Sequence, residues 1–418
     1  MLDDVMRFDM AKKPKRQRLL PLAWALSYPD IIKHKNKITK VDMKGLKPPY
    51  LLLCNHNAFM DFKVATAAVF PHRANYVVAI DGFLKREWLL RTVGCICKRK
   101  FTNDIILIKQ LKHVIDKGDI AVVYPEARYS LCGTTAVLPE SLGKLARLLK
   151  VPVVTLICNG HHINSPFWNL TDRKVKGTMA TMKQILNVEE LKTKSLEKIN
   201  DIIRKEFYYD DFAWQKENNI IVNFPKRAEG LHKVLYQCPH CKAEYKMSSK
   251  NEILRCNACG KEWEMTELGE LKATKGETEF SHIPDWYEWE RANVRKEVVG
   301  GKYYFQSTVR VDALPNADGY IDIGKGTLTH DKNGFVLEGE YKGEKYRIEK
   351  PVASLYSCHI EYEYLGKYGD CVDLNTNTDT FYIYPEGKEF SVTKIALATE
   401  ELYNAEMEQK KLTITEKK

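Results

Sequence analysis

A histidine and an aspartate interrupt an otherwise apolar stretch in "YLLLCNHNAFMDFKVATAAV". His56 follows a predicted buried strand, and Asp61 lies near the start of the next predicted helix. A carboxylate beside an imidazole accepts a hydrogen bond from one ring nitrogen and leaves the other nitrogen free to act as a base. Because no serine or cysteine nucleophile is obvious, such a base would activate a hydroxyl group of the substrate. The alternative is that Asp61 only caps its helix.

Two further groups of charged residues follow other predicted strands. Glu126 and Arg128 lie in "DIAVVYPEARYSLCGTT", where a guanidinium group can bind a phosphate through two parallel hydrogen bonds. Glu126 can orient that arginine or a substrate hydroxyl. Between the two sites, "GCICKRKF" carries a basic triplet of Lys98, Arg99 and Lys100. A surface salt bridge and a solvated basic turn are the simpler interpretations of these two segments.

The elements that must position these residues alternate between strand and helix from about residue 47 to residue 160. "PYLLLC", "NYVVAI", "DIAVVYP" and "VPVVTLIC" have the composition of buried strands, and amphipathic segments separate most of them. This alternation predicts an α/β domain. Ligands of open α/β sheets bind beyond the carboxyl ends of the strands, where His56 and Glu126 are expected.

Four segments, in this order, resemble the glycerolipid acyltransferase family of the bacterial lysophosphatidic acid acyltransferase type. "NHNAFMD" resembles the family's NHxxxxD catalytic block, and "LKREWLLRTVGCICKRK" is similar to its second block, in which a basic residue helps hold the acceptor phosphate. "YPEARYS" resembles the glutamate–arginine block, and "KVPVV" resembles the fourth block. The resemblance covers about residues 47–160.

The resemblance implies an activity and a role for each residue. His56 would be the general base that deprotonates the glycerol hydroxyl of a lysophospholipid, and Asp61 would orient it. The alkoxide would attack the thioester of acyl-CoA or acyl carrier protein without an acyl-enzyme. Lysophosphatidic acid would give phosphatidic acid, a step of phospholipid biosynthesis. The acceptor's phosphate end would be held by Glu126 and Arg128, together with Arg99 or Lys98.

The chain departs from the family pattern in three places. "PEAR" is one residue short, since the family usually has a glycine and another residue between glutamate and arginine. Ala58 stands where a small hydroxyl residue is common, and the basic triplet leaves the aligned cation open. These departures leave the histidine–aspartate chemistry intact. His161 and His162 are predicted to be loop residues outside the chemistry.

Four cysteines form two CxxC pairs separated by fourteen residues in "CPHCKAEYKMSSKNEILRCNACGKEWEM". This spacing is typical of a zinc ribbon, in which four thiolates hold a structural zinc ion in a closed tetrahedral site. The chain has 11 cysteines, an odd number, so a metal site in a reducing cytosol is a better interpretation than a disulfide framework. The predicted ligands are Cys238, Cys241, Cys256 and Cys259.

The length of 418 residues predicts more than one domain. We expect a basic and amphipathic lead over residues 1–46 and an acyltransferase domain with a helical arm over 47–225. The zinc ribbon would span residues 234–268. Short β-rich segments over 298–408 predict a barrel-like domain with a C-terminal helix, which resembles pleckstrin-homology or GRAM domains in architecture.

The net charge of +10 suits an anionic partner. The basic lead precedes Trp24 and several leucines, which is typical of a segment in a membrane interface, although a helix packed on its own domain fits equally. No stretch reaches the roughly 20 apolar residues of a spanning helix. We therefore expect a cytoplasmic enzyme that associates peripherally with the anionic inner face of the cell membrane.

Two other functions are consistent with parts of the sequence. The charge and the ribbon fit a zinc-dependent nucleic-acid-binding protein, but the basic residues gather before the first strand and not across the ribbon, so no nucleic-acid partner is expected. The short "PEAR" block fits a lipid-binding scaffold with a degenerate active site. Neither alternative explains all four segments.

Overall fold

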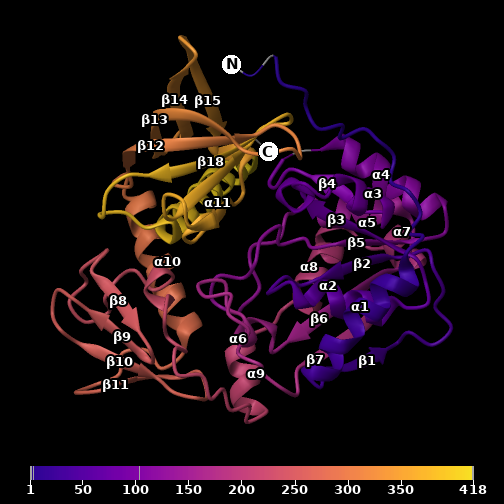
Figure 1. Cartoon of the computed structure of the whole chain (residues 1–418), viewed down its shortest axis with the longest axis horizontal. Coiled ribbons are helices and arrows are strands. Elements are labelled where there is room, and N and C mark those ends of the chain that lie inside the picture. Colours follow the sequence, from indigo (N-terminus) through magenta and orange to yellow (C-terminus); the bar gives the residue numbers. More distant parts are fainter. Residues whose placement is uncertain (1, 3, 103, 417–418) are drawn as a thin grey trace.

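The computed structural model describes residues 2, 4–102 and 104–416 and divides into three regions (Figure 1). An α/β region lies on the right of Figure 1, a small sheet lies at the lower left, and a larger β-rich region lies at the upper left. No helix within the described residues is both long enough and apolar enough to cross a membrane.

The α/β region contains a seven-stranded sheet in the order β1-β7-β6-β2-β5-β3-β4. The strands from β6 to β4 run parallel, and β7 pairs antiparallel with β6. The central strands are fully buried because helices cover both faces of a parallel sheet. The predicted α/β fold is therefore confirmed, with strands β1 Lys37–Val41, β2 Leu51–Cys54, β3 Ala74–Ala79, β4 Ile96–Lys98, β5 Ile120–Val123, β6 Val153–Asn159 and β7 Met179–Leu186.

The helices of this region include the predicted arm, α7 to α9. Residues 1–46, expected as a lead, contribute α1 and the edge strand β1, and α1 packs against α2. His161 and His162, expected in a loop, form the first half of the short helix α6. The helices are α1 Leu20–Lys33, α2 Met60–Val69, α3 Glu87–Thr92, α4 Ile105–Asp116, α5 Leu142–Leu149, α6 His161–Asn164, α7 Val188–Thr193, α8 Leu196–Glu206 and α9 Asp211–Glu217.

The small sheet lies beside the four predicted metal ligands and packs against a helix that the sequence analysis did not predict. Its order is β11-β10-β9-β8, and Trp263 of β10 packs edge-on against Trp286 at a centroid distance of 5.0 Å. Trp286 belongs to α10, which connects this sheet to the β-rich region (Figure 1). The elements are β8 Met247–Lys250, β9 Ile253–Cys256, β10 Glu262–Met265, β11 Leu271–Ala273 and α10 Ile283–Val299.

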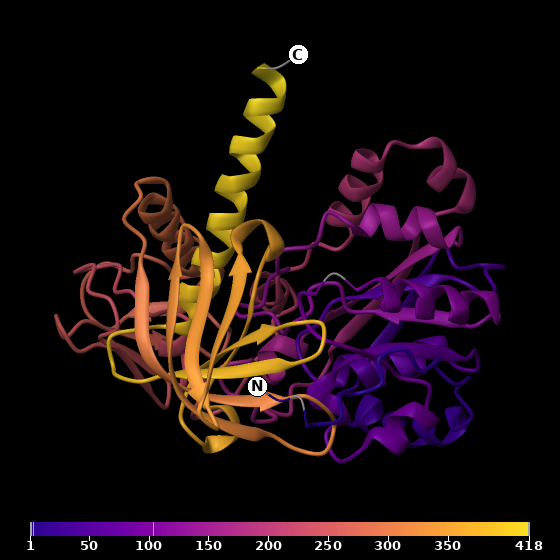
Figure 2. The same cartoon turned by 90° about the horizontal axis from the view of Figure 1, so that it is seen from above.

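The C-terminal region is an antiparallel seven-stranded sheet closed by one helix. Its order is β15-β14-β13-β12-β18-β17-β16, so β15 and β16 are its edges. The closing helix α11, Val392–Glu416, packs against α10 and extends beyond the body of the molecule (Figure 2). The predicted β-rich character is confirmed, while the resemblance to pleckstrin-homology or GRAM domains stays a prediction. The strands are β12 Phe305–Leu314, β13 Ile321–Asp331, β14 Gly334–Tyr341, β15 Glu344–Pro351, β16 His359–Glu361, β17 Cys371–Asn375 and β18 Thr380–Pro385.

The C-terminal sheet and the α/β region share a hydrophobic core. Leu314, Tyr382 and Tyr384 lie in the same buried cluster as Tyr76 and Phe83. The two regions are therefore docked through apolar side chains, and this docking brings the edge strand β16 close to the end of β4.

Candidate active site

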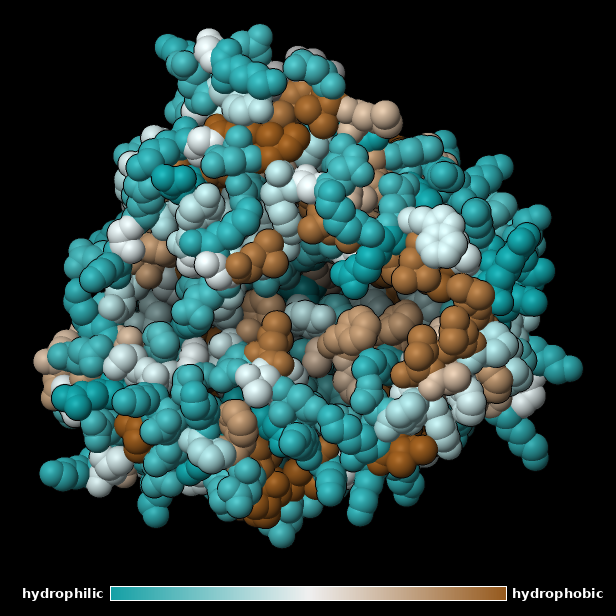
Figure 3. Space-filling view, in the orientation of Figure 1, coloured by the Kyte–Doolittle hydropathy of each residue, from teal (hydrophilic) through white to brown (hydrophobic). Residues whose placement is uncertain are grey.

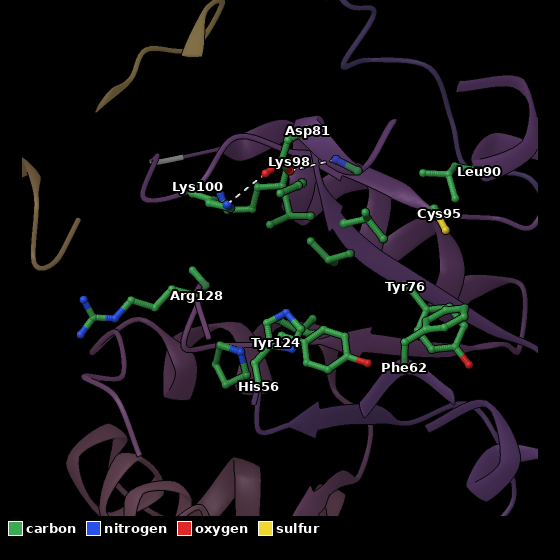
Figure 4. Close-up of a pocket in the computed structure, with 18 of the residues that line it drawn as sticks. His56, Phe62, Tyr76, Asp81, Leu90, Cys95, Lys98, Lys100, Tyr124 and Arg128 are labelled. Atoms are coloured by element: carbon green, nitrogen blue, oxygen red, sulfur yellow. Dashed lines mark hydrogen bonds and ion pairs between the residues drawn. The ribbon is translucent and has the colours of Figure 1, made fainter. Parts of the chain in front are cut away.

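A cavity of about 1200 Å³ opens in the α/β region and is lined at one end by the C-terminal sheet (Figure 4). In the space-filling view, a central hollow is bordered by hydrophobic side chains on the side of the α/β region (Figure 3). The lining changes from polar to apolar along the cavity. Its polar end includes His56, Asp81, Lys98, Lys100, His359 and Glu361, and its apolar part includes Leu22, Phe62, Leu90, Leu107, Leu111 and Leu145.

His56 and Asp61 meet at the carboxyl end of β2. The imidazole of His56 lines the cavity and is 25% exposed, while the Asp61 carboxylate is fully buried behind it. Nδ1 of His56 lies 3.4 Å from Oδ2 of Asp61. The same oxygen accepts hydrogen bonds from the backbone N–H groups of Asn57 and Ala58, at 2.5 and 2.9 Å. Asp61 therefore closes the loop before α2 and also faces the imidazole, so both roles considered from the sequence are combined.

A second histidine shares the Asp61 carboxylate. His161, expected to be a loop residue, lies 2.5 Å through its Nδ1 from Oδ1 of Asp61 and is almost fully buried. Burial alone would raise the pKa of Asp61, but the hydrogen bonds and charges of His161 and His56 outweigh it and hold that pKa well below its usual range. The carboxylate is therefore ionised at neutral pH, as an orienting group for a basic imidazole must be.

The loop that carries His56 is held by Glu126. Its carboxylate accepts a 2.7 Å hydrogen bond from the backbone N–H of His56, another from that of Ala136, and a third from the hydroxyl of Tyr209. Burial raises the pKa of Glu126 to about 8 against the lowering effect of these donors. Glu126 does not line the cavity and contacts the loop that carries His56, and a contact with the acceptor stays a prediction.

Arg128 binds the C-terminal region. Its guanidinium donates to Oε1 of Glu400 on α11 at 2.6 Å and to the carbonyl of Cys358 at 3.3 Å, and Figure 4 shows it pointing away from His56. Burial would raise the pKa of Glu400, but the charges of Arg128 and Arg291 lower it. This ion pair is buried on both sides and ties two regions together, while Arg128 also lines the cavity, so its role as a phosphate ligand stays a prediction.

The residue between Glu126 and Arg128 explains their opposite directions. Ala127 has a φ of +56°, a left-handed conformation that favours glycine. This is the part of the block where the sequence lacks the glycine of the family pattern. The sharp turn sends Glu126 back to the His56 loop and Arg128 outward to α11.

The residues of the basic triplet point in different directions at the end of β4. Lys98 and Lys100 line the cavity, whereas Arg99 points to the opposite side and is buried. The guanidinium of Arg99 donates to the carbonyls of Leu314 and Pro315, both at 2.9 Å. Arg99 is therefore a contact between regions and does not line the cavity, and its role as a phosphate ligand stays a prediction. Lys100, the third residue of the triplet, lines the cavity beside Lys98.

Lys100 lies among carboxylates from both regions. Its Nζ is 3.2 Å from Asp81 and 3.9 Å from Asp373 of β17, and Glu361 of β16 lines the cavity beside it. Burial raises the pKa of Glu361 to about 7 although the charge of Lys100 lowers it. The neighbouring His359 is 2.7 Å from Glu361 through Nε2. Hence the C-terminal sheet supplies part of the polar end of the cavity.

The four predicted metal ligands lie together beside the small sheet, in the turns before β8 and at the end of β9. The sulfur atoms of Cys238 and Cys259 are 3.8 Å apart, those of Cys241 and Cys256 are 3.7 Å apart, and all four lie within 4.8 Å of one another. Four thiolates at a Zn–S distance of about 2.3 Å would lie about 3.8 Å apart around a tetrahedral ion. The donor set and its spacing therefore fit zinc.

Comparisons with known proteins identify the segment that holds these residues. Residues 31–159 match the family described as Acyltransferase, a segment that contains His56, Asp61 and the glutamate–arginine block. The crystal structure of the 1-acyl-sn-glycerophosphate (LPA) acyltransferase PlsC from Thermotoga maritima aligns with a TM-score of 0.37 and 12% identity, over 45% of this chain and 78% of that chain. No curated protein matches the chain.

Proposed function

We propose that this chain, which belongs to the acyltransferase family through residues 31–159, transfers an acyl chain to the free hydroxyl of a lysophospholipid. The donor is acyl-CoA or acyl carrier protein, and the preferred acceptor is lysophosphatidic acid, which gives phosphatidic acid. One observation carries the proposal. The His56 imidazole, with the ionised Asp61 carboxylate behind it, faces a cavity whose remaining walls are mostly apolar.

The chemistry follows from this arrangement. With Nδ1 of His56 turned to Asp61, the other ring nitrogen removes the proton of the acceptor hydroxyl as that oxygen attacks the thioester carbonyl. The tetrahedral intermediate then expels the donor's thiolate, which takes the proton from the imidazolium. Asp61 stabilises the transient cation. General base catalysis of this kind contributes about 10²–10⁴-fold, and the alignment of two bound substrates supplies much of the remainder.

Lys98 and Lys100 are the cations proposed to bind the acceptor phosphate. Burial lowers the pKa of Lys98, whose ammonium donates to the carbonyl of Thr102 at 3.0 Å. The charge of Asp104 offsets this effect of burial only in part, so an incoming phosphate would further stabilise the charged ammonium. Arg99 and Arg128 are already engaged by the C-terminal region, so the two lysines carry this part of the proposal.

The apolar part of the cavity would take the hydrocarbon chain of a substrate. Burial of a methylene group contributes about 0.8 kcal/mol, so a long acyl chain gains substantial binding energy there. The cavity is continuous with the polar end at His56, which lets a thioester or a glycerol hydroxyl reach the imidazole while its chain stays buried.

We propose a peripheral position on the anionic, cytoplasmic face of the cell membrane. Several exposed apolar side chains also line the cavity and lie at its mouth, which supports entry of lipid directly from a bilayer (Figure 3). The basic residues before α1 would add attraction to anionic lipids. The exposed lining residues are Leu22, Leu26, Phe59, Leu89, Ile105 and Leu148.

The four-cysteine cluster is proposed to hold a structural zinc ion. Its ligands come from two turns that flank β8 and β9, and the sheet packs on α10 through Trp263 and Trp286. An ion bound by four thiolates has no open position for a substrate, so its role would be to hold this small fold together.

The test is an acyl-transfer assay of the purified protein with several lysophospholipids and both donor types, read by mass spectrometry. We expect turnover by the wild type and its loss in His56→Ala. His72→Ala, which changes an exposed histidine, is the matched control. Near wild-type turnover by His56→Ala would overturn the mechanism. Liposome binding without turnover would favour a lipid-binding scaffold.

A further inference from the structure

His161 reaches the catalytic pair from a part of the chain outside all four motif segments. It begins the short helix α6 after β6 and is 1% exposed. Nδ1 of its imidazole is 2.5 Å from Oδ1 of Asp61, while Oδ2 of the same carboxylate faces His56. One buried carboxylate thus lies between two imidazoles.

We propose that His161 is a positioning residue for acyl transfer, which holds the Asp61 carboxylate so that Oδ2 faces the catalytic imidazole. This inference rests on the proposed function of His56. Oδ2 also accepts hydrogen bonds from the backbone N–H groups of Asn57 and Ala58. The Nδ1–H of His161 binds the other oxygen, so both oxygens of the carboxylate are held.

The two histidines are not interchangeable as bases. His56 lines the cavity, whereas His161 does not and has almost no exposed surface. A substrate hydroxyl can therefore meet the imidazole of His56 only. His161 acts through Asp61 and never touches the substrate.

The second ring nitrogen of His161 indicates its tautomer. Nε2 lies 3.3 Å from the amide nitrogen of Asn36, which also donates to the hydroxyl of Thr178 at 2.7 Å. An amide NH₂ group donates hydrogen bonds only, so Nε2 is an acceptor and the proton resides on Nδ1, where Asp61 accepts it. The order of donation is therefore Asn36 to His161 to Asp61.

The backbone of α6 is held so that His161 cannot move away. The carboxylate of Asp211, at the start of α9, accepts hydrogen bonds from the N–H groups of Gly160 and His162, at 3.0 and 2.8 Å. Gly160 has a φ of +88°, and a Cβ atom there would lie 2.9 Å from Thr178 and 3.0 Å from Trp214. The position of the imidazole is thus set by helix α9 of the arm.

The kinetic test compares His161→Ala with His161→Asn. Alanine removes the donor to Asp61, and we expect kcat to fall by about 10–100-fold, the range for loss of an outer hydrogen-bonding support, with KM unchanged because His161 lies outside the cavity. Asparagine places an N–H group near the position of Nδ1, so it should restore most of kcat.

His162→Leu is the matched control, because the His162 ring packs against Trp168 and not against Asp61. Equal kcat values for wild type and His161→Ala would overturn the proposal, and so would loss by alanine that asparagine does not rescue.

A second measurement does not depend on turnover. In protein labelled with ¹⁵N at histidine, NMR should show one imidazole in the Nδ1–H tautomer with a strongly downfield proton, and this signal should be absent from His161→Asn. An Nε2–H tautomer at His161 would overturn the proposed hydrogen bond. If the wild type transfers no acyl group to any acceptor, the proposed function fails, and the positioning role of His161 in acyl transfer fails with it. The NMR result still decides whether the Nδ1–H of His161 binds Asp61.

Discussion

Two clusters of charged side chains share the polar end of the cavity and differ in how their charges are balanced. The Asp61 cluster consists of His56, Asp61 and His161 and comes entirely from the α/β region. Donors surround its carboxylate, whose pKa is lowered in spite of burial. The Lys100 cluster joins both regions and has more carboxylates than cations. It consists of Asp81, Lys100, His359, Glu361 and Asp373.

The difference lies in the response to pH. Asp61 keeps its charge throughout the neutral range, so the orientation of the catalytic imidazole is constant. Glu361, with a pKa raised to about 7 by burial, changes charge within that range. The first cluster is therefore suited to orienting an imidazole, and the second is suited to joining two regions.

The largest expected effect is on the Asp61 cluster. Asp61→Asn should lower kcat by as much as about 10⁴-fold, the loss that follows when a carboxylate that orients a catalytic histidine becomes an amide. Both oxygens of Asp61 face N–H donors, so an amide nitrogen meets a donor in either orientation. Steady-state kinetics measures the effect, and the exposed Asp42→Asn is the control. A loss below tenfold would show that the imidazole needs no carboxylate.

The second effect concerns the ion pair between the regions. Arg128→Met should lower the free energy of unfolding by about 3–5 kcal/mol, because it leaves the buried Glu400 carboxylate without one of its two arginines. Denaturant unfolding measures this, and Arg128→Met with Glu400→Gln should recover part of the loss. An acceptor KM that rises without loss of stability would assign Arg128 to phosphate binding after all.

The third effect tests Lys98 as a ligand of the acceptor phosphate. Lys98→Met should raise the acceptor KM by about 10–150-fold, since a hydrogen bond to a charged group contributes about 1.5–3 kcal/mol. The donor KM should change little. Lys40→Met, on an exposed position of β1, is the control. If the KM for a phosphate-free acceptor rises equally, Lys98 serves the cavity wall and not the phosphate.

The smallest effect tests the charge state of the Lys100 cluster. The pKa of Glu361 is about 7 in the folded chain and near 4.5 when unfolded, so folding favours its neutral form. Its stabilising contribution is complete below about pH 4.5 and is lost as pH rises to about 7. The free energy of unfolding of Glu361→Gln, relative to wild type, should therefore increase over this interval.

The comparison with wild type is needed because a neighbouring group acts in the opposite direction. Burial and the charge of Lys100 lower the pKa of His359, whose contribution is lost as pH falls. Lys100, Asp81 and Asp373 also face this group. All of them are present in both proteins, so a difference that does not change with pH would contradict the raised pKa of Glu361.

The parts of the site that could be predicted depend on short stretches of chain. The strands of the α/β region have continuous apolar runs, and His56 follows one of them directly, so its place at the sheet edge was evident. The four cysteines were evident for the same reason, since two CxxC pairs define a site by spacing alone.

The parts that could not be predicted depend on partners far along the chain. Arg99 binds Leu314, and Arg128 binds Glu400, 272 residues later, so no local pattern marks either arginine as a contact between regions. His161 depends on Asp211 for its position, and α10 carries mixed charged and aromatic residues without a clear periodicity. Lys98 ends β4 and Lys100 lies in the turn after it, so no strand pattern in the sequence places the two lysines on one side.

The left-handed turn at Ala127 makes the α/β region depend on the C-terminal region. On one side of the turn, Glu126 holds the loop that carries His56, and on the other side Arg128 binds Glu400 of α11. The α/β region alone would carry Arg99 and Arg128 as uncompensated cations on an uncovered apolar face. Separation of the α/β region from the C-terminal sheet would therefore remove the partners of both arginines and the cover of this apolar face.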